Sequence, residues 1–441
     1  MKNKRLIILS ALILIVGITS AYFIFKKRSN TLVLADQSLG LCVSEVLWND
    51  FRRRIKNLTN LNTSKGETCP NQLSLKNEIS GDEQVIYEKR LNLSPEDLGK
   101  FFQGKIEGDV IYIVLDQEVF NESLASDLKK EYKQNPPKSA SLVAGGDVSL
   151  ARYNDYMIEK KGADYCFSEI KSLFLNSDIG FVNLESPFGL GKTNHDRNSM
   201  VFSAEVENAP ILKNAGINLV NLANNHFGNQ GQTCMKLTFE TLAKQNIAYF
   251  GAGLNDNEAR EATIKEIRGL KIAFLGYTDN DVLASSDKAG ANRAGVNDMA
   301  SADLNQDIAM AKSNADIVVV SMHSGAEYTP YANRRQINFA HKAIDSGADL
   351  VIGHHPHVVQ GIENYKGKFI IYSLGNLVFD QPWSEETKQG LLLKTEFLFG
   401  KVVSLGLEPI YIQDFCQPSS ASSDLTGKIL QRIFSASEKL R

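Results

Sequence analysis

Histidine and carboxylate side chains gather at a few positions between residues 147 and 357. Five of the seven histidines stand at or just after the ends of short apolar segments, namely His226, His323, His354, His355 and His357. Asp147 and Glu185 end two further segments of this kind. Imidazole together with carboxylate suits Zn²⁺, Mn²⁺ or Fe²⁺, and a carboxylate with two free oxygens can bridge a pair of such ions. The residue types therefore predict a metal centre.

These side chains share one place relative to the elements expected around them. Apolar strands that run into the polar groups are expected at 141–144, 179–182, 217–220, 317–320 and 350–352. Helical stretches are expected at 231–245, 301–313 and 334–346. The alternation is typical of a layered α/β domain. Ligands of open α/β sheets bind at the carboxyl ends of the strands, so the polar groups should meet at one edge.

Two hairpins complete the expected fold. Residues 263–267 and 271–275 flank an Arg268-Gly269 turn, and residues 391–398 and 402–410 flank a turn at 399–401. We therefore expect two packed sheets flanked by helices.

Length and charge limit the class of protein. The 441 residues include 48 Lys and Arg against 51 Asp and Glu, for a formal net charge of -3. This balance lacks the basic footprint of a nucleic-acid-binding protein.

A chain of this length can bury more than one core. We expect a membrane anchor with basic flanks at 1–30, a small α/β region of unknown role at 31–138, the main domain at 139–415, and a C-terminal tail or helix at 416–441. Pro136-Pro137 marks the second boundary.

The N-terminus predicts a membrane anchor. Residues 6–25 are uncharged, almost wholly apolar and about long enough to cross a bilayer as one helix. Basic residues flank both sides, so the positive-inside rule leaves the orientation open. A cleaved signal peptide is the competing interpretation, although residues 19–21 make a poor cleavage site. We expect a single-pass protein of the cell membrane with an extracytoplasmic main domain.

The five cysteines show no CxxC pair and no zinc-ligand spacing. In an extracytoplasmic protein, Cys42 and Cys69 could close a local disulfide and leave an odd number of thiols. In the cytosol all five would be buried thiols. The sequence leaves both possibilities open.

Six motifs in residues 141–381 together resemble the CapA-like family of capsule or poly-gamma-glutamate synthesis proteins, within the calcineurin-like metallophosphoesterase superfamily. The motifs are, in chain order, Gly146-Asp147, Asn183-Leu184-Glu185-Ser186-Pro187, Asn221-Leu222-Ala223-Asn224-Asn225-His226, His323-Ser324-Gly325-Ala326-Glu327-Tyr328, Gly353-His354-His355-Pro356-His357-Val358-Val359-Gln360 and Tyr372-Ser373-Leu374-Gly375-Asn376. The resemblance implies a four-layer αββα sandwich that holds two divalent ions (Mn, Zn or Fe) at its rim.

The resemblance also implies residue roles. Asp147 would bind the first ion, Glu185 would bridge both, and His357 would return to the first. The second ion would be held by Asn225, His323 and His355. His226 would donate a proton to the leaving group. The substrate pocket would be lined by Asn224, His354, Glu327 and Tyr328.

Two positions depart from the family pattern. Phosphoesterases begin with Asp-x-His, whereas Ser149 stands at the histidine position here. Many CapA-like sequences have an aspartate where this chain has Asn229, and an amide cannot hold an imidazolium as a carboxylate would. Taken alone, Asp147 could be a turn or cap residue and Asn224-Asn225 a turn pair. Their joint occurrence in order favours the metal rim.

Three functions are consistent with these features. The first is a metal-dependent hydrolase of a phosphate ester, an amide or a related bond, acting in biosynthesis or export of an anionic polymer at the cell surface. The second is a non-catalytic assembly component that binds the polymer or its synthesis machinery. The third is a phosphoesterase acting on nucleic acid, against which the charge balance and the anchor argue.

Overall fold

The computed structural model describes residues 138–440 except 192, 301 and 399, together with three short strands nearer the N-terminus. These strands are β1 (Ile24–Lys26), β2 (Thr31–Leu34) and β3 (Val110–Ile113). The predicted anchor lies outside the described residues except for Ile24 and Phe25 of β1. Cys42 and Cys69 also lie outside them, as do the predicted signal-peptide cleavage site and Pro136-Pro137. Among the described helices, none is long and apolar enough to cross a membrane.

The larger sheet contains the first strand ends of the predicted site. Its strands run in the order β1, β2, β3, β20 (Lys401–Gln413), β19 (Gln389–Leu398), β4 (Ser139–Val148), β5 (Ile179–Leu184), β8 (Leu219–Asn221) and β9 (Ala248–Phe250). The strands β4, β5, β8 and β9 are parallel, so their carboxyl ends meet at one edge. The antiparallel pair β19–β20 confirms the second predicted hairpin. Two short strands extend this sheet: β18 (Asn376–Val378) beside β4, and β21 (Gln417–Ser420) beside β20.

The smaller sheet supplies the remaining strand ends. Its order is β11 (Thr263–Ile267), β12 (Leu270–Thr278), β14 (Ile317–His323), β15 (Leu350–His354), β17 (Lys368–Ile371) and β16 (Ile362–Tyr365). Both β14 and β15 run parallel to their neighbours, with His323 opposite His354. The pair β11–β12 confirms the first predicted hairpin. Its turn residues Arg268 and Gly269 both have positive φ, as the tight type I′ turn requires.

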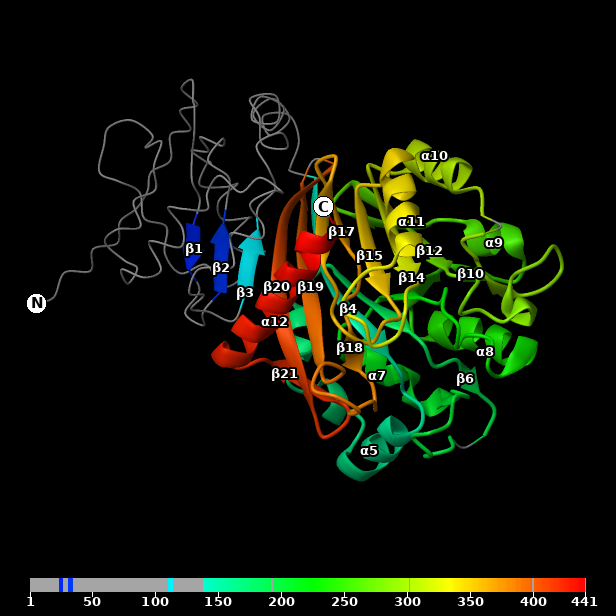
Figure 1. Cartoon of the computed structure of the whole chain (residues 1–441). Coiled ribbons are helices and arrows are strands. Elements are labelled where there is room, and N and C mark those ends of the chain that lie inside the picture. The colour runs from blue at the N-terminus through cyan, green and yellow to red at the C-terminus, as the bar shows by residue number, and fades with distance from the viewer. Residues whose placement is uncertain are drawn as a thin grey trace, which may run out of the picture.

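Helices cover the outer faces of the two sheets (Figure 1). One core joins the larger sheet to α5 (Tyr153–Lys161), α6 (Lys171–Leu175), α7 (Ala209–Asn214) and α8 (Gly231–Lys244). A second core joins the smaller sheet to α10 (Leu304–Asn314) and α11 (Arg334–Asp345). Between the sheets, the ring of Phe181 lies 6.3 Å from that of Phe274. The fold is mixed α/β, as predicted, with layers in the order helices, sheet, sheet, helices.

Local signals explain where the helices begin. At the start of α11, the Asn333 side chain accepts a hydrogen bond from the Gln336 backbone and the Gln336 side chain accepts one from Asn333. This reciprocal capping box satisfies two backbone donors that a helix start leaves free. Asp303 caps α10 in the simpler way, by accepting from Gln306 N. That helix therefore begins at Leu304, a turn later than the expected 301.

The C-terminal residues expected as a tail or helix form β21 and α12 (Ser423–Ser437). A disulfide joins Cys166 to Cys416, 250 residues apart. Cys234 is a free, buried thiol. The remaining described strands and α-helix are β6 (Phe188–Gly189), β7 (Ala204–Glu205), α9 (Asp256–Arg260), β10 (Ala252–Gly253) and β13 (Gly295–Val296).

Candidate metal centre

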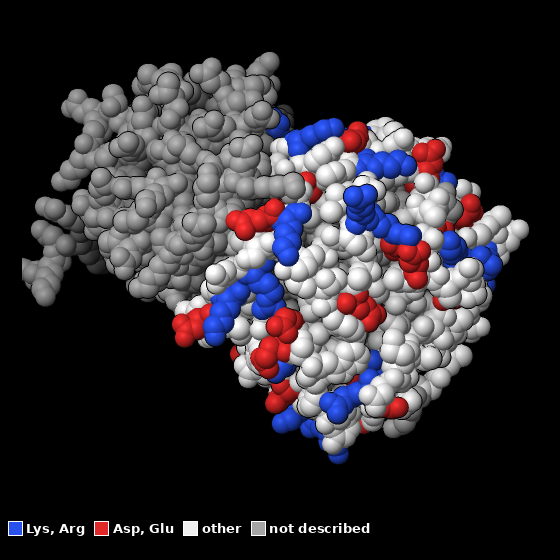
Figure 2. Space-filling model, viewed as in Figure 1, with Lys and Arg blue, Asp and Glu red and all other residues white. Residues whose placement is uncertain are grey.

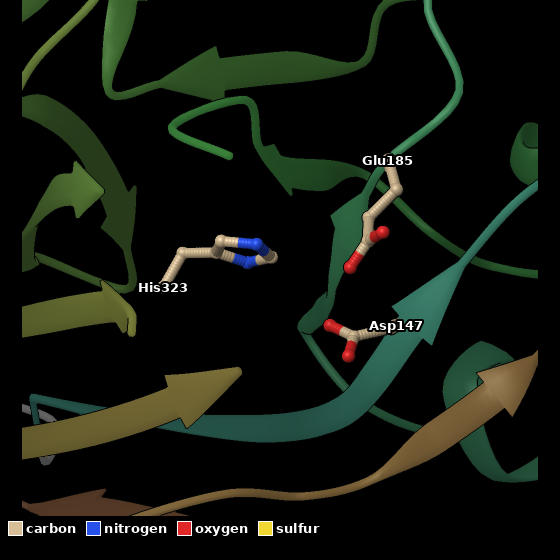
Figure 3. Close-up of side chains that lie close together, drawn as sticks. All are labelled: Asp147, Glu185 and His323. Atoms are coloured by element: carbon tan, nitrogen blue, oxygen red, sulfur yellow. The ribbon is translucent and has the colours of Figure 1, made fainter. Parts of the chain in front are cut away.

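The two sheets bring their carboxyl edges together at the predicted site. Asp147 is near the end of β4, Glu185 directly follows β5, and His323 ends β14 of the other sheet. Figure 3 shows these three side chains pointing toward one another from their separate strands. One ligand atom from each lies within 4.8 Å of the others, and all three residues are fully buried. Two carboxylates and an imidazole at this spacing can hold a divalent cation.

The remaining predicted ligands adjoin this group. Asn225 Oδ1 lies 2.8 Å from His323 Nε2. The ring of His355 lies 4.8 Å from that of His323. His357 Nδ1 lies 3.4 Å from Asp147 Oδ2. The structure therefore gathers all six residues that were predicted to bind metal.

The backbone near the site is constrained where these ligands approach one another. His355 and His357 have backbone φ angles of 99° and 57°, values that residues other than glycine seldom adopt. Such conformations cost about 1–3 kcal/mol each and concentrate at functional sites. Beside Asp147, a Cβ at Gly146 would lie 1.8 Å from the Gly375 carbonyl oxygen. Only glycine therefore permits the contact between β4 and the segment before β18 that places Asp147.

The pKa values of the two carboxylates shift in opposite directions. Burial by itself would raise the pKa of Asp147, but the neighbouring imidazoles of His354 and His357 hold that pKa well below its usual range. Burial and the charge of Asp147 raise the pKa of Glu185 well above its usual range. Two carboxylates this close repel each other when both are ionised. A bound divalent cation would relieve this repulsion and let both remain charged.

The pKa values of the buried histidines also shift in different directions. Burial and the charge of His357 lower the pKa of His355 to about 4. Burial lowers the pKa of His323 well below its usual value, with His355 adding to the effect. For His357, burial is outweighed by the charges of Glu185 and Asp147, which raise its pKa to about 9. The neutral imidazole is the form that binds metal, so His323 and His355 are already in that form, whereas His357 would release its proton when an ion binds.

The donor set fits a divalent metal pair. Within the described part of the chain, Glu185 Oε2 and His355 Nδ1 are buried without a hydrogen-bond partner. Leaving a buried polar atom unpaired is costly, so each such atom needs an explanation, and an ion that it could ligate provides one. Mixed oxygen and nitrogen donors match Zn²⁺, Mn²⁺ or Fe²⁺.

His226, the predicted proton donor, stands at the edge of the cluster. Its Nε2 lies 3.8 Å from Glu185 Oε2, and its Nδ1 lies 3.0 Å from Asn229 Oδ1. The His226 ring stacks on Phe202 with centroids 3.9 Å apart. Burial lowers its pKa to about 3 despite the hydrogen bond with Asn229, so the ring is neutral at pH 7.

The residues expected to line a substrate pocket occupy two different environments. Asn224 and His354 are fully buried. Asn224 Nδ2 donates to the Leu184 carbonyl, and the His354 ring meets Phe181 edge-on between the sheets. Glu327 and Tyr328 are exposed, and the Tyr328 ring lies 6.1 Å from that of His357. Glu327 and Tyr328 are therefore placed to contact a ligand. Asn224 and His354 instead support the predicted metal-binding residues from within the core.

Sequence reasoning assigned no role to two amides that contact the ligands. Asn183 Nδ2 lies 2.8 Å from Asp147 Oδ1, 3.2 Å from Glu185 Oε1 and 3.2 Å from His323 Nδ1. Its Oδ1 accepts from Asn221 Nδ2, which fixes the orientation of the amide. Asn376 Oδ1 similarly contacts His357 Nδ1 at 2.9 Å. The available signal for Asn183 was its spacing of two residues from Glu185, which places both on one side of an extended strand.

Comparison with known proteins places this geometry in a family. Residues 141–381 match the family described as bacterial capsule synthesis protein PGA_cap. The chain is 32% identical over 299 residues to the capsule biosynthesis protein CapA of Bacillus anthracis, covering 64% of this chain and 70% of that protein. It is 38% identical over 256 residues to the PGA biosynthesis protein CapA of Bacillus subtilis, covering 58% of this chain and 66% of that protein.

Solved structures with some likeness include the calcineurin-like phosphoesterase YfkN from Bacillus subtilis. It is 17% identical with a TM-score of 0.36, and the match covers 69% of this chain and 100% of that one. A score this low assigns neither a residue role nor an activity. The family match spans more than half of the chain and includes every predicted metal ligand. The chain therefore belongs to the PGA_cap family of bacterial capsule synthesis proteins, among the CapA-like proteins.

Proposed function

We propose that this chain is a membrane-anchored protein of capsule or poly-gamma-glutamate biosynthesis or export. Its α/β domain would be of the calcineurin-like metallophosphoesterase type and would hydrolyse a phosphate ester, an amide or a related bond with two divalent ions. The observation that carries this proposal is the convergence of Asp147, Glu185 and His323 within 4.8 Å, with Asn225, His355 and His357 around them.

Each residue has a stated part in this proposal. Asp147 and His357 would hold the first ion, Asn225, His323 and His355 the second, and Glu185 both. When bound, two ions that share a carboxylate acidify a water molecule into a nucleophile at neutral pH. Asn183 holds the two carboxylates in place through its amide. His226 Nε2 lies 3.8 Å from Glu185 Oε2. Because burial lowers the pKa of His226, an anionic substrate beside the ring would have to raise that pKa before His226 could protonate the leaving group.

Metal content of the full-length protein, purified in detergent and supplied with Mn²⁺ or Zn²⁺, tests the site. We expect about two equivalents per chain by elemental analysis, because the donors divide between two ions. Asp147→Ala and His355→Ala should each lower this number and abolish hydrolysis of para-nitrophenyl phosphate. His341→Ala is the matched control, because His341 pairs with Glu363 away from the cluster. A wild-type protein that binds no metal would refute the proposed site.

A non-catalytic role is the second candidate, and two local contacts favour it. The hydroxyl of Ser149, at the family's usual histidine position, accepts a hydrogen bond from Ala151 N at 3.2 Å. His226 has the amide of Asn229 beside it and is neutral, which weakens it as an acid. In this case the metals would be structural or would bind polymer carboxylates. Normal polymer output from a strain carrying His226→Ala, with loss of polymer on deletion of residues 1–30, would favour this role over hydrolysis.

The proposed compartment is the outer side of the cell membrane. The Cys166–Cys416 disulfide supports it, because disulfides persist in oxidising compartments and are rare in the cytosol. Figure 2 shows basic and acidic side chains interspersed on this face of the described residues. Such a mixture differs from the clustered basic patch that is typical of a nucleic-acid-binding face. Trapping free thiols in intact cells tests the compartment, since Cys166 and Cys416 should be protected from alkylation until a reductant is added.

A further inference from the structure

Arg152 is a buried cation behind the proton-donor side of the site. It is 1% exposed, and its partner Asp380 is fully buried. The guanidinium Nη2 pairs with Asp380 Oδ1, and Nη1 donates to the Ser199 carbonyl at 3.0 Å. Asp380 Oδ2 also accepts from Tyr153 N at the start of α5. The ion pair therefore links the segment after β4 to the segment after β18.

The guanidinium lies over an aromatic ring that contacts His226. Arg152 Cζ lies 4.3 Å from the centroid of Phe202. The Phe202 ring stacks on His226 with centroids 3.9 Å apart and also meets the Phe379 ring edge-on at 5.8 Å. Asn229 Oδ1 accepts from Phe202 N at 2.8 Å and lies 3.0 Å from His226 Nδ1. One amide thus ties the Phe202 backbone to the imidazole, while the guanidinium lies over the Phe202 ring.

The energetics indicate a geometric role for this pair. Burial raises the pKa of Asp380 even though Arg152 opposes the shift. Replacing a buried ion pair with apolar groups is often neutral or stabilising, so stability alone does not explain why the pair is present. Arg152 also has a backbone φ angle of 57°, which is unfavourable for residues other than glycine. The buried ion pair and the unfavourable Arg152 backbone conformation both occur in a segment that adjoins the metal centre.

We propose that Arg152 is a positioning residue that holds the Phe202 ring against His226 and so fixes the imidazole where a leaving group would depart. This inference rests on the proposed hydrolase function for its consequence, but the geometry can be tested without any activity. Arg152 itself would not contact the substrate. A lysine could keep the charge but could not present a planar face to Phe202.

The first measurement is NMR of full-length protein in detergent, labelled with carbon-13 at histidine. The chain has 7 histidines, and the His226 ring signal is the one lost in His226→Gln. Stacking on Phe202 should shift this signal upfield. Arg152→Met and Asp380→Asn should move it toward the unstacked position, while the matched control Arg260→Met, which breaks the Arg260–Asp307 pair elsewhere, should not. An unchanged His226 signal in folded Arg152→Met or Asp380→Asn protein would overturn the proposal.

The second measurement compares two esters in the presence of Mn²⁺. Phenyl phosphate has a poor leaving group that needs a proton, whereas para-nitrophenyl phosphate does not. Arg152→Met should reduce hydrolysis of phenyl phosphate by about tenfold or more and of para-nitrophenyl phosphate by less than about threefold, part of the effect of a general acid. Equal losses on both esters would contradict a positioning role toward His226. If wild-type protein hydrolyses neither ester, the phosphate-ester form of the proposed function fails and the NMR result alone decides the role of Arg152.

Discussion

Replacing Cys166 and Cys416 together with alanine should lower the free energy of unfolding by several kcal/mol. The bridge spans 250 residues of sequence, and closing a loop of that length is worth about 5 kcal/mol at 25 °C in the chain-entropy treatment. In the folded protein, the bonds from Tyr165 Oη to Asp414 Oδ2 at 2.7 Å and from Gln417 Nε2 to Ser168 Oγ at 3.0 Å already hold the two segments together. Most of the loss should therefore arise in the unfolded chain, and we expect about 3–5 kcal/mol.

Guanidinium chloride unfolding, followed by circular dichroism of the full-length protein, measures this loss. The double variant should unfold at a lower midpoint than wild type, and the difference should largely disappear in dithiothreitol, which opens the wild-type bridge. Cys234→Ala is the matched control, because it removes a buried thiol without removing a bridge, at a cost of about 1 kcal/mol. Equal midpoints under oxidising conditions, or a difference that persists fully in reductant, would refute the loop-closure argument.

Three further predictions concern separate parts of the molecule. Asn183→Ala should weaken Mn²⁺ affinity by about 10–100-fold, measured by competition with a chelating dye, because the amide orients Asp147 and Glu185. Phe181→Ala should cost about 3–5 kcal/mol in denaturant unfolding, because its ring fills the space between the sheets. Arg268→Met should lower the unfolding midpoint at neutral pH but not in strong acid. Burial alone would raise the pKa of Asp178, but Arg268 lowers it, so this stabilisation is present above the usual carboxyl pKa and lost as pH falls through the lowered value. A difference between Arg268→Met and wild type that grew toward acid pH would contradict that sign.

The strand ends show why much of the site could be predicted. Each predicted apolar segment is only three or four residues long and so short enough to be a single strand. The polar residue after it must then lie at the carboxyl edge of a parallel sheet. Asp147, Glu185 and His323 follow from this rule without knowledge of any contact. Their division between two ions came from the family resemblance, because spacing alone cannot say which ligands share an ion.

The sequence could not predict contacts between segments that are far apart in the chain. Arg152 and Asp380 are 228 residues apart, and neither has a neighbour in sequence that signals the other. The same holds for Cys166 and Cys416. Only a local Cys42–Cys69 bridge was named from the sequence, as one of two open possibilities. Asn183 carried a visible signal in its alternation with Glu185, but whether its amide faces the ligands depends on Asn221 of the next strand.

By itself, the sequence determined the family, the alternation of strands and helices, and the edge at which the ligands collect. These depend on local periodicity and on residue type, which do not require a partner. Only the tertiary structure decided how the two sheets face each other, because that arrangement depends on side-chain packing such as Phe181 against Phe274. It also decided that the ligands are buried deeply enough for their pKa values to separate, since desolvation arises from the whole surrounding fold.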